Sequence, residues 1–159
     1  MPVEFHAAPI SEMNPLALYR VLRLRTDVFV VEQECAYPEL DGRDLESDAL
    51  MLWGEAGGDV IATLRILRDA AAMRIGRVAV RRSDRGTGIA RTLMLRGLEL
   101  CEETGAGLDQ VLDAQEPLER WYGAFGFVRD GATFLEDGIP HVPMRRASAT
   151  RSESRASAG

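Results

Sequence analysis

The sequence predicts an α/β or α+β fold, a sheet with helices around it. Apolar runs of strand length alternate with segments of helical periodicity. Three of the runs follow one another across short turns, as in an antiparallel meander. The chain then continues with helix, strand, helix and two strands, an order typical of a layered sheet and helix fold.

The N-terminal part predicts a strand, a helix and a loop. Val3 and Phe5 alternate with polar residues, which indicates a short first strand. Asn14-Pro15 is a good helix start, because Asn suits the N-cap and proline fits the first helical position. Residues 34–48 are rich in acids and predict an acidic loop or a short helix. The apolar stripe expected on the first helix consists of Leu16, Tyr19, Leu22 and Val28 or Phe29.

The middle and end of the chain supply the remaining elements. The meander is expected over residues 49–55, 60–67 and 73–80. The clearest helix spans residues 88–104 and ends at the glycines of 105–107. Its expected apolar face consists of Ile89, Ala90, Leu93, Met94, Gly97, Leu98 and Cys101. A strand over 108–114, a helix over 117–125 and strands over 127–135 and 142–144 complete the prediction.

Length and composition predict one domain over residues 1–146. Residues 147–159 contain no large apolar side chain, so a disordered tail is expected there. No apolar run approaches the roughly 20 residues needed to span a bilayer, and the N-terminus lacks a signal-peptide pattern. We therefore expect a cytoplasmic protein with no membrane partner.

Cysteine, histidine and charge exclude several classes. Cys35 and Cys101 are too few for a disulfide framework, and Cys101 is expected to be buried in its helix. His6 and His141 lie far apart without a cysteine pair, so no metal site is predicted. The net charge of −6 argues against nucleic acid. All 19 basic residues are arginine, so the arginine-rich band over 74–91 is weak evidence by itself.

The segment Arg-Gly-Thr-Gly-Ile-Ala-Arg at residues 85–91 is the most informative motif. It directly precedes a helix, so it presents unpaired backbone N–H groups at a positive helix N-terminus. Gly86 and Gly88 permit unusual backbone angles and close approach of a ligand. Such a turn binds an anion, most often a phosphate. It is neither a P-loop nor a dinucleotide fingerprint, because no Gly-Lys-Ser/Thr follows and a meander precedes it.

A second motif is the aromatic segment of residues 115–127. A helix carrying Trp121-Tyr122 runs into Phe125-Gly126-Phe127 and then into a strand. Such aromatic side chains usually pack in a core. The hydroxyl of Tyr122 can also serve as a proton donor.

Together, the two motifs resemble those of the GNAT superfamily of acetyl-CoA-dependent N-acyltransferases, over about residues 3–146. Residues 24–33, 41–45 and 137–144 are similar to its ElaA-like branch. The resemblance implies a GNAT fold: a mixed, mostly antiparallel sheet of about 6–7 strands with about four helices. It also implies a splay between the strands near Val80 and Leu112. ElaA-like chains usually carry a histidine in the region corresponding to residues 48–52, and this chain has none.

The resemblance further implies a donor site for acetyl-CoA, with coenzyme A as product and no metal. The strand at 78–80 would pair with the pantetheine arm, and a backbone N–H near Val80 would polarise the thioester carbonyl. The amides of the turn would hold the pyrophosphate, and Tyr122 matches the general acid that protonates the thiolate. The implied cofactor-binding residues are Val78, Ala79, Val80, Arg85, Gly86, Thr87, Gly88, Ile89, Ala90, Arg91, Gln115 and Tyr122.

The general base and the acceptor site are less defined. Base candidates are Glu32, Glu136, Asp137 and His141, of which we single out Glu32 and His141. The candidates for binding the acceptor are Glu32, Asp41 and His141, since acids suit a cationic amine. Arg25 is expected either to pair with the Glu32 region or to cap the first helix.

The function these motifs favour is transfer of an acetyl group to a primary amine of a small molecule, peptide or protein. The amine would attack directly in a ternary complex. One alternative is a longer acyl donor, because Arg-x-x-Val-Phe at residues 25–29 is similar to acyl-homoserine-lactone synthases. The others are a non-catalytic acetyl-CoA-binding module and a nucleotide- or phosphosugar-binding domain. A homodimer is left open.

Overall fold

The structure is a computed structural model that describes residues 2–150. Its described residues form two compact units. Unit 1 comprises residues 2–67 and Gly76–Gly97, and unit 2 comprises Arg68–Ile75 and residues 98–150. The single domain expected over residues 1–146 stays a prediction.

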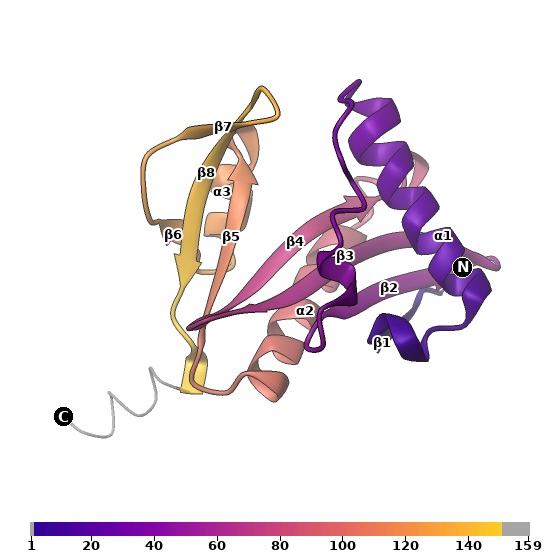
Figure 1. The fold of residues 1–159 in the computed structure, drawn as a ribbon, viewed down its shortest axis with the longest axis horizontal. Helices are drawn as coiled ribbons and strands as arrows, with labels where there is room; N and C mark the ends of the chain where they lie inside the picture. The colour runs from indigo at the N-terminus through magenta and orange to yellow at the C-terminus, as the bar shows by residue number, and fades with distance from the viewer. Residues whose placement is uncertain (1, 151–159) are drawn as a thin grey trace. The chain divides into compact units, whose positions relative to one another are not determined.

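Eight strands and three α-helices lie within residues 2–150 (Figure 1). The strands are β1 (Glu4–Ala8), β2 (Leu50–Ala56), β3 (Asp59–Asp69), β4 (Ala72–Val80), β5 (Asp109–Gln115), β6 (Val128–Arg129), β7 (Phe134–Glu136) and β8 (Ile139–Arg146). The α-helices are α1 (Pro15–Thr26), α2 (Ile89–Thr104) and α3 (Glu119–Gly123). Short helical segments are η1 (Ile10–Glu12), η2 (Asp27–Glu32), η3 (Arg43–Leu45), η4 (Arg82–Asp84) and η5 (Glu116–Leu118).

The strands are hydrogen-bonded in the order β1-β2-β3-β4-β5-β8-β6, with β7 paired to β8. The pairs β1–β2, β2–β3, β5–β8, β6–β8 and β7–β8 are antiparallel, while β4–β5 is parallel. A mixed, mostly antiparallel sheet is therefore confirmed. The splay expected near Val80 and Leu112 concerns residues of different units and stays a prediction.

Helix α1 begins where the sequence predicts but buries another face. Asn14 is its N-cap, and the Asn14 side chain accepts a 2.8 Å hydrogen bond from the backbone N–H of Leu16. The predicted stripe is wrong at Leu16 and Tyr19, which are 63% and 68% exposed, whereas Val28 is buried as predicted. The buried residues of α1 and η2 are Ala17, Val21, Leu24, Arg25 and Val28.

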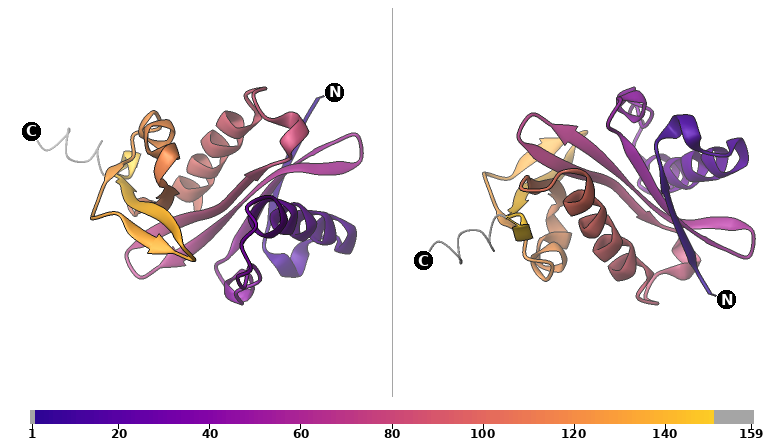
Figure 2. Two further views of the ribbon diagram at one scale, coloured as in Figure 1. Left: turned by 90° about the horizontal axis from the view of Figure 1, so that it is seen from above. Right: turned by 90° about the horizontal axis from the view of Figure 1, so that it is seen from below.

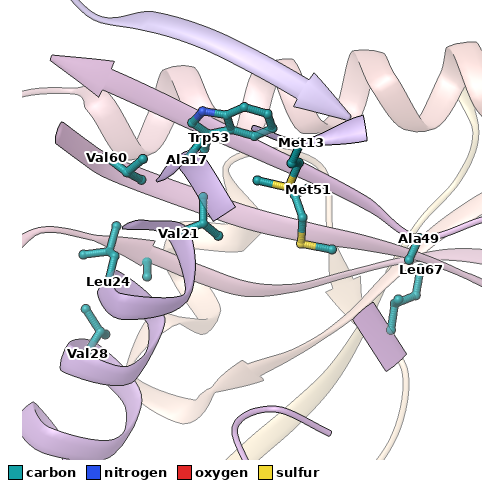
Figure 3. Close-up of a cluster of buried hydrophobic side chains, with 11 residues drawn as sticks. Met13, Ala17, Val21, Leu24, Val28, Ala49, Met51, Trp53, Val60 and Leu67 are labelled. Atoms are coloured by element: carbon teal, nitrogen blue, oxygen red, sulfur yellow. The ribbon is translucent and has the colours of Figure 1, made fainter. Parts of the chain in front are cut away.

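The core of unit 1 lies between α1 and the strands. Side chains from α1 point toward those of β2 and β3, with Met51 and Trp53 among them (Figure 3). The residues 89–97 of α2 lie on the opposite face of these strands (Figure 2). Leu64 on β3 packs there, since a Cβ at Gly97 would come within 2.8 Å of its side chain. Both faces of the central strands are thus covered, which explains their continuous apolar runs.

The predicted helix over 88–104 is confirmed as α2. Leu93, Met94, Leu98 and Cys101 are buried, as the apolar stripe requires. Burial raises the pKa of the Cys101 thiol to about 12, so the thiol stays protonated and unreactive at neutral pH. The helix ends at Gly105, where an added Cβ would lie 2.5 Å from the Met73 sulfur.

Unit 2 is organised around the β5–β8 ladder, which α3 contacts (Figure 1). The ladder pairs Gln115 at the end of β5 with His141 on β8. Strands β7 and β8 form a hairpin whose two-residue loop is Asp137-Gly138. Both loop residues have positive φ, 50° and 79°, as a type I′ turn requires.

The end of the described chain is held by unit 2. Ser148 is buried, and its N–H donates to Asp109 at 3.1 Å. Ala149 N–H and the hydroxyls of Ser148 and Thr150 donate to Glu102 at 2.9–3.2 Å. The disordered tail is predicted over 147–159, but order extends to Thr150, and residues 151–159 lie outside the described residues. Within residues 2–150, no helix is long and apolar enough to cross a membrane.

Candidate functional site

The glycine turn, residues 85–91, joins η4 to the first turn of α2. Gly86 and Gly88 both adopt the left-handed region, with φ of 76° and 84°. The Thr87 hydroxyl donates a 2.5 Å hydrogen bond to Asp84 O, which ties the turn to η4. The first N–H groups of a 16-residue α-helix have no intrahelical acceptor. Residues 85–88 are exposed and Ile89 and Ala90 are half-buried, so these N–H groups can donate to an anion that arrives from solvent.

Arg85 joins the turn to two other parts of unit 1. Its Nε donates to Val80 O at 3.0 Å, at the end of β4. Its Nη1 donates to Glu32 Oε2 at 2.9 Å, at the end of η2. The structure therefore brings Glu32 to the glycine turn, as part of an ion pair with Arg85.

The second half of β4 leads into the turn. Val78 is half-buried, whereas Ala79 and Val80 are buried. Arg81 N–H, directly after the strand, donates to Ile61 O at 2.7 Å. Just before this segment, Arg77 has a φ of 52°, an unusual value for a non-glycine residue.

Tyr122 lies on α3 in unit 2 and is buried. Its ring packs edge-on against Trp121 and Phe127, with centroids 4.9 and 6.4 Å away. Burial raises the pKa of the hydroxyl to about 12. Within residues 2–150 that hydroxyl makes no hydrogen bond to the protein. A protonated, unengaged hydroxyl can donate its proton to a bound group.

His141 and Gln115 face each other across the β5–β8 ladder. The Nδ1 atom of His141 lies 2.7 Å from Ile139 O. Because a carbonyl oxygen only accepts, Nδ1 carries the hydrogen and the neutral ring keeps a lone pair on Nε2. Nε2 lies 3.8 Å from Glu136 Oε2, and the ring stacks on Phe134 at 5.9 Å. This arrangement fixes the ring and leaves one nitrogen able to accept a proton.

A buried ion cluster in unit 1 was not predicted from the sequence. Arg25 Nε donates to Glu39 and Arg25 Nη1 to Asp44, both at 2.6 Å. The guanidinium of Arg65 contacts Asp41 at 2.8 Å and Asp44 at 3.4 Å. The members of this buried ion cluster, named after its four buried residues Arg25, Glu39, Asp44 and Arg65, also include the half-buried Tyr37 and Arg77 and the exposed Asp41.

The cluster corrects the expectation for Arg25 and bears on Asp41, whose acceptor-binding role stays a prediction. Arg25 is 1% exposed and pairs with Glu39 and Asp44, rather than pairing with Glu32 or capping the first helix. Burial disfavours its charge, but the two carboxylates outweigh this, and the pKa of Arg25 is raised. Burial acts against the charge of Asp41 too, but Arg65, the Arg43 N–H and Arg77 lower its pKa to about 2. Asp41 is therefore engaged by arginines, which leaves little net charge to attract a cationic acceptor.

The partners of the cluster are distant in sequence, which is why sequence reasoning missed it. Asp41 and Arg65 are 24 residues apart, and Arg77 and Glu39 are 38 apart. An acidic stretch by itself indicates a solvated loop, and no periodicity marks its partners. Among the residues described, no group of His, Cys, Asp and Glu side chains could hold a metal ion.

The fold and these groups define a class of protein, the GNAT acyltransferases. The sequence matches the family described as the acetyltransferase (GNAT) domain over residues 23–148, and the chain belongs to this family. A UPF0039 protein of Mycobacterium tuberculosis is 45% identical over 86% of this chain and 88% of its own length. Protein ElaA of Escherichia coli is 37% identical over 91% of this chain and 96% of its own.

Solved structures agree. An acyl-CoA N-acyltransferase of Pseudomonas aeruginosa superposes with a TM-score of 0.89 at 38% identity, covering 92% of this chain and 100% of that one. The structure of Escherichia coli ElaA gives a TM-score of 0.87 at 36% identity, over 91% and 99% of the two chains. The resemblance to the ElaA-like branch is thus confirmed. Neither the ElaA name nor the UPF0039 name states an activity.

Proposed function

We propose that the protein transfers an acetyl group from acetyl-CoA to a primary amine of a small molecule, peptide or protein. The observation that carries the proposal is the glycine turn, where two left-handed glycines open the N-terminus of α2. Exposed N–H groups and the helix dipole favour a pyrophosphate there. Membership of the GNAT family supports acyl-CoA as its source, and the N-acyltransferase that the chain resembles supports an amine acceptor.

In this proposal unit 1 binds the donor. The amides of the glycine turn hold the pyrophosphate, and the strand at 78–80 pairs with the pantetheine arm. A backbone N–H near Val80 polarises the thioester carbonyl as charge develops on its oxygen. Arg85, already fixed to Val80 O, exchanges Glu32 for a phosphate oxygen when the donor arrives.

Unit 2 supplies the proton transfers. The Nε2 atom of His141 accepts a proton from the attacking amine, and Glu136 stabilises the resulting imidazolium. The C–N bond forms first and the C=O electron pair moves onto the oxygen; when that pair returns, the C–S bond breaks and the Tyr122 hydroxyl protonates the departing thiolate. We favour His141 over Glu32 as the base, because the Glu32 carboxylate is already paired with Arg85. Gln115, across the ladder from His141, contacts the donor.

A direct test measures thiol release from acetyl-CoA across polyamines, amino acids, aminoglycosides and peptides. We expect turnover with at least one class of primary amine. Calorimetry with acetyl-CoA, a longer acyl-CoA, ATP and NAD accompanies the assay. Binding of acetyl-CoA without turnover of any amine would instead indicate a non-catalytic module, and faster turnover of the longer donor a different acyl specificity. A protein that binds ATP or NAD but no acyl-CoA contradicts the proposal.

The role of Tyr122 has its own test. Tyr122→Phe keeps the ring packing and removes the hydroxyl, so turnover should fall about 100-fold while acetyl-CoA affinity stays unchanged. A thiol-release assay measures the turnover, and calorimetry measures the affinity for acetyl-CoA. Trp121→Phe, on the neighbouring ring, is the matched control and should retain most of the turnover. Equal turnover of Tyr122→Phe and the unsubstituted protein excludes Tyr122 as the acid.

A further inference from the structure

Arg77 holds an unusual backbone position within β4. Three non-glycine residues have positive φ in the part of the chain that is described: Glu34, Arg77 and Asp137. Of these three, Arg77 alone lies inside a strand. A left-handed residue changes the direction of a strand and re-aims the residues that follow. Here the residues that follow are Val78 to Val80.

The side chain of Arg77 is anchored on the acidic loop by four contacts. Its Nε lies 2.7 Å from Glu39 Oε2. Its Nη2 donates to Glu39 O and to Asp41 Oδ2, both at 3.2 Å. The guanidinium carbon lies 5.4 Å from the centre of the Tyr37 ring, a cation–π distance. A bulky residue in the left-handed region persists only when its surroundings over-determine it, as they do here.

The anchor is itself rigid. Glu39 Oε1 accepts from Arg25 at 2.6 Å, and Glu39 Oε2 accepts from the Tyr37 hydroxyl at 2.5 Å. Asp41 also accepts from both terminal nitrogens of Arg65, at 2.8 and 3.0 Å. Arg77 therefore ties its strand to side chains that already have fixed partners on α1 and β3.

We propose that Arg77 is a positioning residue for the acyl donor. The buried ion cluster fixes the side chain of Arg77, and this side chain stabilises the left-handed backbone conformation of Arg77 in β4. That conformation orients the backbone of Val78–Val80 toward the thioester. The loop over 37–41 thereby controls donor geometry without touching the donor. This inference rests on the proposed function, in which Val78–Val80 bind the pantetheine arm.

The test compares Arg77→Gly, Arg77→Lys and Arg74→Gly. Glycine tolerates positive φ but lacks the anchor, so Arg77→Gly separates the side chain from backbone strain. Arg74 is the matched control, because it lies on the same strand and pairs with Asp69 and Asp113 at 2.6 and 3.2 Å. Arg77→Gly should raise the KM for acetyl-CoA and lower kcat, each about 10-fold, while Arg77→Lys recovers part of both. Arg74→Gly should leave both constants within twofold.

A second measurement does not depend on activity. Amide hydrogen exchange of Val78–Val80 in the free protein should be faster in Arg77→Gly than in Arg74→Gly, with circular dichroism confirming that both fold. Unchanged exchange together with an unchanged KM in Arg77→Gly overturns the positioning role. If the unsubstituted protein binds no acyl-CoA, the proposed function fails, and the exchange result alone then decides whether Arg77 fixes the strand.

Discussion

The acidic loop over 37–44 and the glycine turn over 85–91, both in unit 1, use their polar groups in opposite ways. In the loop, Glu39, Asp41 and Asp44 are bound by arginines from α1, β3 and β4. In the turn, the side chain of Arg85 is bound, while residues 85–88 are exposed and lead into a helix start whose first N–H groups lack intrahelical acceptors. The charges that look available for a ligand in the sequence are thus internal to the fold. In the proposed function, the donor is bound instead by backbone groups that carry no formal charge.

The largest effect should come from breaking the ion cluster at its centre. Arg25→Met leaves Glu39 and Asp44 buried without their main partner, which we expect to lower the free energy of unfolding by about 3–5 kcal/mol. Urea unfolding measures the loss. Arg23→Met is the matched control. Arg23 is exposed, and its Nε comes no closer than 3.8 Å to the Asp27 carboxylate, so its ion pair is weak. A loss below about 1 kcal/mol for Arg25→Met contradicts a structural role of the loop charges.

An intermediate effect should come from the glycine turn. Gly88→Ala forces a left-handed alanine, so the turn must either strain or move its N–H groups, and acetyl-CoA should bind about 10-fold more weakly. Gly107→Ala imposes the same strain in unit 2, at a φ of 82° with no neighbouring atom. Calorimetry on both variants separates binding from general destabilisation. Equal affinities in the two variants refute backbone recognition by the turn.

A smaller effect should depend on pH. The pKa of Asp41 is lowered to about 2, so its carboxylate contributes stability above the unfolded value near 3.8 that is lost as the pH falls through about 2. Allowing for solvent exposure, Asp41→Asn should cost about 1 kcal/mol at pH 7. Urea midpoints between pH 2 and 7 should show the variant and the unsubstituted protein converging in acid. A pH-independent difference means that the Asp41 charge is not the cause.

The smallest effect should come from a surface pair in the same loop. Arg43 Nε lies 2.8 Å from Glu46, but both side chains are well exposed, at 38% and 40%. Arg43→Ala should therefore change the free energy of unfolding by no more than about 0.5 kcal/mol. The same urea series measures it. A loss as large as that of Arg25→Met shows that burial does not distinguish the two pairs.

Features made of residues adjacent in the sequence could be predicted, whereas contacts between residues distant in the sequence could not. The glycine turn and α2 could be predicted because Gly88, the helix start and the apolar stripe are adjacent in sequence. The stripe of α1 could not, because its large apolar residues Leu16 and Tyr19 face solvent while Arg25 is buried with two acids. Burial of Arg25 depends on carboxylates 14 and 19 residues away, and no local pattern encodes such a pairing.

The same reasoning applies to the candidate catalytic groups. Tyr122 could be singled out from the aromatic segment of residues 115–127. That its hydroxyl has no hydrogen-bond partner in the described part of the protein could not be predicted. The ring of His141 is held by the carbonyl of Ile139, at the start of the same strand. Its place opposite Gln115 depends on the register between β5 and β8, which the sequence does not show. Arg77 gave no sequence signal, because nothing in its type indicates a positive φ.

The hydrogen bonds at Glu102 bear on where the chain can be shortened or joined to another protein. Burial acts to raise the pKa of this carboxyl, but donors from Ala149, Gln110, Ser148 and Thr150 outweigh it, and the pKa is lowered. Glu102 on α2 thus holds the C-terminal end of the described chain, residues 148–150, against unit 2. A fusion point after Thr150 preserves the hydrogen bonds to Glu102. A chain cut at residue 146 leaves Glu102 without three of its donors. Protonation of Glu102 in acid should weaken its hydrogen bonds to residues 148–150, and proteases should then cleave this segment faster.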